Sequence, residues 1–158
     1  MTTLLALSTV TVLCYLCLSV KVAGGIPVSL SATYYMLGNR GWLFQAFMVL
    51  TAATLFPVWV EHSGNGHEWM AFLACASLLF VAAAPCFKLE LEGKVHYTSA
   101  VVCCVCAVSW QLAEGLWDVT LWCAFIAGML SLQERDKWCW WLECAVFVSL
   151  YMNLYRLI

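Results

Sequence analysis

The strongest constraint on the fold is a series of six apolar runs, each about as long as a membrane-spanning helix, within a chain of 158 residues. A helix needs about 20 mostly apolar residues to cross a bilayer. The runs cover residues 3–23, 42–60, 69–87, 96–113, 115–132 and 138–157. Short turns join the last three runs, so these helices must be antiparallel neighbours. The pattern predicts an all-α, polytopic transmembrane bundle of six helices with short loops, a single integral membrane domain over residues 1–158.

The composition agrees with an integral membrane protein. Hydrophobic residues make up 65% of the chain and charged residues 10%, whereas a soluble domain is nearer half apolar and a quarter charged. All ten cysteines lie inside the apolar runs or at the end of one, where free thiols behave as small buried hydrophobes. No basic patch exists, and nucleic acid is therefore not an expected partner. No basic residue precedes the run 3–23, so we interpret it as a retained helix and not as a signal peptide.

Basic residues predict the orientation in the membrane. With six helices both termini share one side, and the first, third and fifth loops lie on the other. Six of the seven basic residues fall in or beside those three loops: Lys21, Arg40, Lys88, Lys94, Arg135 and Lys137. Cytoplasmic loops carry an excess of Lys and Arg. We therefore expect loops one, three and five to be cytoplasmic and both termini to lie outside.

The first loop, "GGIPVSLSATYYMLGNRG" (24–41), is too apolar for a solvated loop and too broken for a full span. One interpretation is a short helix lying at the membrane interface. The other is a re-entrant segment, which is tolerated only where protein covers its backbone or where it lines a cavity. In the second case Ser29, Ser31 and Thr33 supply the polar groups of the lining. The sequence leaves both interpretations open.

The third loop, "FKLELEGKVHYT" (87–98), alternates apolar and charged residues on either side of Gly93. Strict alternation is typical of extended chain with one apolar face. We therefore expect a small hairpin over the cytoplasmic end of the bundle, with His96 where it meets the fourth helix. Because loops one and three share a side, His96 is expected to approach Ser29 and Ser31.

The catalytic candidates are Ser29, Ser31 and His96, together with Glu143 of the last run. A serine nucleophile needs a base within hydrogen-bond reach and a third group to orient that base. Glu143 lies inside the last run, and an ionisable residue in a span is by default a functional-site hypothesis. The plainer alternatives are that His96 is a polar anchor at the interface and that Glu143 pairs with Lys137 or Lys94. Gln45 and Gln111 are interpreted as hydrogen-bonding groups between helices.

The second loop, "EHSGNGHEW" (61–69), supplies the candidates for a metal site. Glu61, His62, His67 and Glu68 are residue types that bind zinc and other divalent ions. The glycine-rich centre is typical of a flexible solvated turn, and exposed charge clusters usually face water. No cofactor is predicted, and a divalent metal is kept as the alternative.

The order of these features resembles one group of small membrane proteins. The first loop has a "PxSxS" core of Pro27, Ser29 and Ser31, Pro85 closes the third run, and His96 opens the fourth. In outline, and over most of the chain, this is similar to the DRAM/FRAG type of six-helix membrane proteins and its uncharacterised bacterial relatives. The resemblance implies a lipid-related role and no firm activity. It also implies that the serine and histidine loops face outward, against the cytoplasmic placement that the charges predict.

The leading functional hypothesis is a protein that is not an enzyme. It would bind lipid, a hydrophobic ligand or a membrane-protein partner through the face formed by loops 24–41 and 87–97. The first alternative is a membrane-embedded lipid hydrolase that uses Ser31 and His96. The second is a small transporter or channel subunit with Glu143 on its path. Helices rich in tryptophan and small residues permit a homo-oligomer without requiring one.

Overall fold

The structure is a computed structural model and describes residues 1–64, 66–87 and 89–158, in which every regular element is a helix. The α-helices are α1 (Thr2–Ala23), α2 (Ala32–Met36), α3 (Trp42–Glu61), α4 (Glu68–Ala83), α5 (Leu89–Ala113), α6 (Trp117–Gln133) and α7 (Trp138–Leu157). Three short 3-10 turns join them: η1 (Gly38–Arg40), η2 (Ala84–Cys86) and η3 (Arg135–Lys137). The all-α class is confirmed, and the long helices match the predicted runs closely except at the start of α5.

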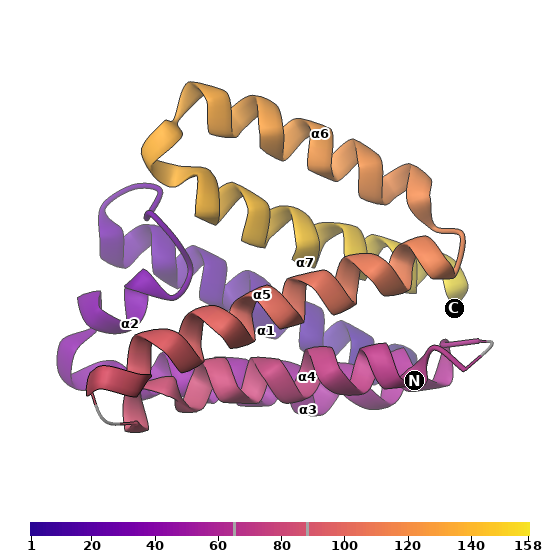
Figure 1. Cartoon of the computed structure of the whole chain (residues 1–158), viewed down its shortest axis with the longest axis horizontal. Coiled ribbons are helices and arrows are strands. Elements are labelled where there is room, and N and C mark those ends of the chain that lie inside the picture. Colours follow the sequence, from indigo (N-terminus) through magenta and orange to yellow (C-terminus); the bar gives the residue numbers. More distant parts are fainter. Residues whose placement is uncertain (65, 88) are drawn as a thin grey trace.

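The long helices lie side by side in alternating directions, with both termini at one end of the bundle (Figure 1). In the packing order, α1 contacts α3, α3 contacts α4, α4 contacts α5, and α6 contacts α7. Contacts between α5 and α7 are much sparser than these. The bundle is therefore tight on one side and open along the line where α5 faces α7.

Small residues on α4 explain the tight side of the bundle. Ala71, Ala74, Cys75 and Ala82 follow one helical stripe, and all are buried. Lipid tails are as apolar as these side chains, so burial from water does not drive helices together inside a membrane. Small side chains instead let the backbones approach closely and gain van der Waals contact. The stripe accounts for the packing of α4 against both α3 and α5.

Four segments are long and apolar enough to cross a membrane: Thr2–Ala23, Gly38–Glu61, Glu68–Cys86 and Leu91–Ala113. This agrees with a membrane protein. The six-span count is not established, because α6 has only 17 residues and α7 carries Glu143, Asn153 and Arg156. Crossing by α6 and α7 stays a prediction.

The hairpin predicted for residues 87–98 is wrong. Helix α5 begins at Leu89 and continues through Gly93 and His96 to Ala113. The alternation is short, and Leu, Glu and Lys are all strong helix formers. A helix also satisfies its own backbone groups, which a hairpin at a membrane surface does only in part. One internal glycine costs a helix about 1 kcal/mol, which is too little to end α5. Lys88 lies outside the described residues.

Candidate functional site

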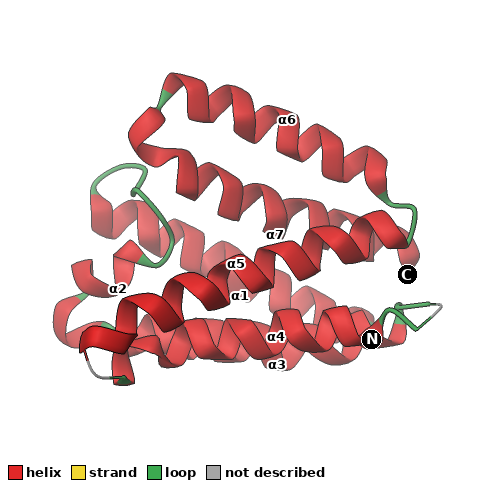
Figure 2. Cartoon of the chain, in the orientation of Figure 1, coloured by secondary structure: helices red, strands yellow, loops and turns green. Residues whose placement is uncertain are grey.

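The first loop begins with a turn that directs the chain back toward the bundle. Gly24 has φ of 66°, a left-handed conformation that glycine adopts without strain and that commonly ends a helix. The Gly25 N–H donates to the Val20 carbonyl at 3.0 Å. Pro27 then prevents the helix from resuming. The chain continues as the irregular loop that Figure 2 draws in green before α2.

A carboxylate holds this loop in the bundle. The Leu30 N–H donates to Glu143 Oε2 at 2.7 Å, and Leu30 itself is buried. Thr33 is fully buried, and its hydroxyl bonds both to the Leu30 carbonyl and to the hydroxyl of Tyr15 on α1. Irregular backbone at membrane depth needs protein partners of this kind. Leu30 and Thr33 thus pack into the bundle, while Tyr35 and Met36 of the short helix α2 are exposed. The choice between an interfacial and a re-entrant segment stays a prediction.

The partner of Glu143 differs from the prediction. Lys137 Nζ pairs with Glu134 Oε2 at 3.2 Å, and Lys94 is exposed. The described residues place no cation within ion-pair distance of Glu143. A backbone N–H of a distant loop occupies the carboxylate instead. Sequence reasoning missed this contact because every non-proline residue has such a donor.

The other end of loop one is fixed by two tyrosines. The Tyr34 ring covers Gly41, where an added Cβ would lie 2.7 Å from Tyr34 Cε2. The Tyr35 hydroxyl donates to Glu92 Oε1 on α5. Because the neutral phenol is the donor, this bond raises the pKa of Tyr35 to about 12. Loops one and three therefore approach one another as expected, although the third is helical.

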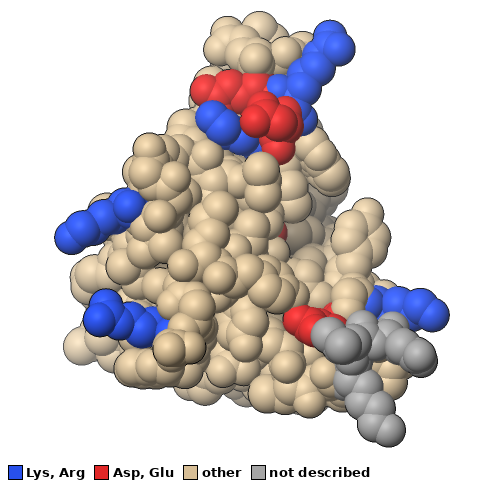
Figure 3. Space-filling view, turned by 90° about the vertical axis from the view of Figure 1, so that its left-hand side faces the viewer, with Lys and Arg blue, Asp and Glu red and all other residues tan. Residues whose placement is uncertain are grey.

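A groove of about 640 Å³ lies where α5 faces α7, with loop one at its end. Figure 3 shows the molecule hollowed on this side. Its walls are mainly apolar and come from Ala100, Val101, Cys104, Val105 and Val108 of α5 and from Trp138, Cys139, Leu142 and Val146 of α7. The loop-one end of the groove is polar. It is lined by all four of the catalytic candidates, Ser29, Ser31, His96 and Glu143.

Glu143 and Ser31 also line a second space. An internal cavity of about 60 Å³ lies behind them, between α3, α4, α5 and α7. Its other lining residues are mostly apolar, among them Met48, Leu78 and Phe147. Glu143 therefore stands between the core and the groove, with one carboxylate edge bonded to loop one.

At the polar end of the groove, the described residues do not form a hydrogen-bonded catalytic triad. Ser29 Oγ lies 3.2 Å from Ser31 Oγ and accepts the Ala32 N–H at 3.1 Å, at the start of α2. Among the hydrogen bonds of the described residues, none joins His96 to either serine or to Glu143. A general base needs a partner within about 2.6–3.2 Å, although such contacts often tighten only with substrate bound. These groups offer a ligand both hydrogen-bond donors and acceptors.

The second loop does not gather the metal candidates. His67 Nδ1 lies 3.0 Å from Glu114 Oε1, which also accepts the Gly64 N–H at 2.8 Å. His62 Nδ1 donates to the Val58 carbonyl at 2.8 Å, while Glu61 and Glu68 are exposed. In the part of the chain that is described, no three potential ligands are placed to hold a metal ion. Asn65 lies outside that part. The metal site stays a prediction from sequence, and Glu114 instead fastens this loop to the end of α5.

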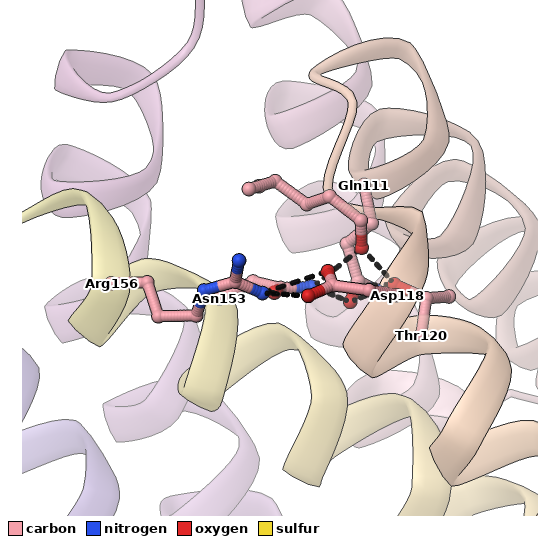
Figure 4. A network of polar contacts seen from close by, with 6 residues as sticks. Gln111, Asp118, Thr120, Asn153 and Arg156 are labelled. Atoms are coloured by element: carbon pink, nitrogen blue, oxygen red, sulfur yellow. Dashed lines mark hydrogen bonds and ion pairs between the residues drawn. The ribbon is translucent and has the colours of Figure 1, made fainter.

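A polar network joins α5, α6 and α7 at the end of the bundle that holds the termini (Figure 4). The side-chain oxygen of Gln111, Oε1, accepts hydrogen bonds from Thr120 Oγ1 at 3.0 Å and from Asn153 Nδ2 at 2.9 Å. All three residues are buried. At the surface, Arg156 Nη1 donates to both carboxylate oxygens of Asp118, at 2.8 and 2.9 Å. The interpretation of Gln111 as a link between helices is confirmed. Asn153 was missed, although a lone amide in an apolar helix is itself a signal.

The interpretation of Gln45 is confirmed in the same way. Its Nε2 donates from α3 to the Ala82 carbonyl of α4 at 3.0 Å.

Comparison with protein-family models, with curated proteins and with solved structures finds no match to this chain. The DRAM/FRAG likeness therefore stays a resemblance, and the groove is what bears on function.

Proposed function

We propose that this membrane protein binds a lipid-like amphiphile in the groove between α5 and α7. The observation that carries the proposal is the uneven distribution of polar groups in the groove. Ser29, Ser31, His96 and Glu143 gather at the loop-one end, whereas the described lining toward the far end is apolar apart from Ser109. From His96 to Val108 the α5 wall runs for about 18 Å at ~1.5 Å per residue. That length suits a single hydrocarbon chain, with its head among Ser29, Ser31, His96 and Glu143.

The polar end decides what the groove selects. A hydrocarbon chain leaves one apolar environment, the bilayer, for another, and it gains little from the transfer. Hydrogen bonds to the head are stronger there than in water because the surroundings are of low dielectric constant. The apolar walls therefore admit many chains, and the four polar residues discriminate between heads.

The orientation proposed for the chain places this polar end at the cytoplasmic surface. Lys21 closes α1, Arg40 closes η1, and Arg135 and Lys137 belong to η3. These elements lie at the end of the bundle that faces the viewer in Figure 3. Arg156 lies at the other end, in the last turn of α7. By the positive-inside rule the first end faces the cytoplasm, where the heads of inner-leaflet lipids lie.

Photo-crosslinking in lipid nanodiscs tests the binding. A long-chain alcohol that carries a diazirine on its chain is expected to label peptides of α5 and α7, and the unlabelled alcohol is expected to compete. Val105→Trp fills the groove and should reduce the labelling several-fold. Val10→Trp is the matched control, because Val10 is exposed on α1 to nearly the same degree, 56% against 57% for Val105.

Two results would overturn the proposal. One is labelling spread evenly over the lipid-facing helices that the unlabelled alcohol does not reduce. The other is a Val105→Trp variant that is labelled as strongly as the Val10→Trp variant while both keep the helical content of the wild type.

A lipid hydrolase is the second candidate, because two serines, a histidine and a carboxylate line one end of the groove. In that reaction Ser31 is the nucleophile and His96 the base. Ser31→Ala and His96→Ala should each abolish release of fatty acid from an ester lipid, while Ser29→Ala should retain it. Full turnover in both of the first two variants would exclude this candidate.

A further inference from the structure

The charged side chains at the polar end of the groove indicate which class of head group the groove can bind. This inference rests on the proposed binding of an amphiphile. Among the described residues that line the groove, Glu143 is the one Asp, Glu, Lys or Arg. The other polar side chains of the described lining are those of Ser29, Ser31, His96, Tyr97 and Ser109, and no described Lys or Arg belongs to it. The nearest cation in sequence on α7, Lys137, is already paired with Glu134 at 3.2 Å.

Glu143 has acceptor capacity left over. Its polar neighbours are the Leu30 N–H, at 2.7 Å, and the thiol of Cys139, both neutral donors. A carboxylate has about four lone-pair sites for hydrogen bonds. An ionised group away from water is costly unless a counter-charge accompanies it. The described residues place no such counter-charge within ion-pair distance, so a cationic ligand would supply what the protein lacks.

An anionic head fits this end poorly for the same reason. A carboxylate or phosphate would be placed beside Glu143, and the described lining offers no Arg or Lys to receive it. Like charges in contact at low dielectric constant repel strongly. An uncharged alcohol avoids the repulsion but makes weaker hydrogen bonds than an ammonium group does.

We infer that the groove selects a long-chain amine, with its ammonium group bonded to Glu143 and to the hydroxyls of Ser29 and Ser31. The apolar chain lies between α5 and α7, along Val101 and Val105. An ammonium group has three donors, which match the carboxylate and the two hydroxyl oxygens.

A competition experiment with matched heads tests this selection. An amine, an alcohol and a carboxylic acid of equal chain length compete with the diazirine alcohol for the protein in zwitterionic nanodiscs at neutral pH. The quantity measured is the mole fraction of each competitor in the bilayer that displaces the probe. The amine should displace the probe at a roughly tenfold lower fraction than the alcohol, because a charge-assisted hydrogen bond is worth more than a neutral one. The acid should be the weakest competitor.

Glu143→Gln should remove the preference for amine over alcohol. Glutamine keeps a carbonyl oxygen for the Leu30 N–H, so loop one retains its anchor. Glu134→Gln is the control, since it removes a carboxylate from the same end of the bundle without touching the groove. It should leave the preference unchanged.

The outcomes separate the two proposals. If the acid or the alcohol competes as well as the amine in the wild-type protein, the inference is overturned while binding of amphiphiles stands. If Glu134→Gln abolishes the preference as fully as Glu143→Gln, surface charge and not the groove attracts the amine, and the inference is again wrong. If none of the three displaces the probe, the proposed function itself fails. Should Glu143→Gln not fold, the comparison of heads on the wild-type protein still decides.

Discussion

Replacing Asn153 by leucine tests the polar network at the end of α5, α6 and α7. The two side chains have similar volumes, so the change removes hydrogen bonds and leaves little cavity. Asn153 is fully buried, and its Nδ2 lies 2.9 Å from Gln111 Oε1, 3.2 Å from the Leu116 carbonyl and 3.2 Å from Thr120 Oγ1. An amide nitrogen has two N–H groups, so about two of these three contacts act as full bonds.

The expected loss of stability follows from that count. Hydrogen bonds between membrane helices contribute about 0.6 kcal/mol on average and at most about 1.7 kcal/mol. Two bonds then give roughly 1–2 kcal/mol, together with a small term for the Leu116 carbonyl, which loses a partner. The free energy of unfolding should fall by this amount for Asn153→Leu.

The assay is equilibrium unfolding in mixed micelles of a mild detergent and sodium dodecyl sulfate, followed by circular dichroism. Met152→Leu is the control, because Met152 is the neighbouring residue on α7 and is exposed. Its effect should stay within about 0.5 kcal/mol. Combining Asn153→Leu with Gln111→Leu completes a cycle, in which the coupling should be about 0.6–1.7 kcal/mol. A single variant as stable as Met152→Leu, with no coupling in the cycle, would refute the assignment of the network as a link between helices.

Two further predictions concern the anchors of loop one. The bond from Tyr35 to Glu92 favours the neutral phenol, so its stabilising effect is complete below pH 10, the ordinary Tyr value, and is lost as the pH rises through about 12. The absorbance of the wild-type protein and of the Tyr35→Phe variant is measured as the pH rises, and the difference between the two curves should show one phenolate appearing near pH 12. A phenolate that appears near pH 10 would contradict the bond. Gly41→Ala should lower the free energy of unfolding by about 1–3 kcal/mol, since its new Cβ meets the Tyr34 ring at 2.7 Å. Gly25→Ala, with no atom within 4 Å of the added Cβ, is the control, and equal stability of the two variants would count against the contact.

Some contacts were accessible from sequence because their residue type was unusual for its place. Gln45 and Gln111 are amides in apolar helices, and each bonds to a neighbouring helix as predicted. Glu143 was recognised as exceptional for the same reason. Its partner was not, because the Leu30 N–H carries no signature in the amino-acid sequence. A candidate residue was thus easier to find than its contact.

The hairpin error has a related cause. The alternation over residues 87–92 is a pattern of side-chain polarity. It does not specify the backbone hydrogen bonds, which form the continuous helix α5 over residues 89–113. Six alternating residues cannot outweigh the continuity of a helix that is already required from His96 onward. Helix propensity of Leu, Glu and Lys was the better guide to this segment.

The amino-acid sequence was enough to predict that the chain is helical and roughly where each long helix begins and ends. Backbone N–H and C=O groups in an apolar environment must form their hydrogen bonds within their own segment. The length of each apolar run is therefore enough to predict a helix there. The packing of the helices was needed to establish which helix faces meet, that loop one packs into the bundle, and that α5 and α7 leave a groove ending at Glu143. In a soluble helix an apolar stripe marks the buried face. Here the outward faces are as apolar as the inward ones, with Val10 and Phe125 exposed, so no pattern in the sequence distinguishes them.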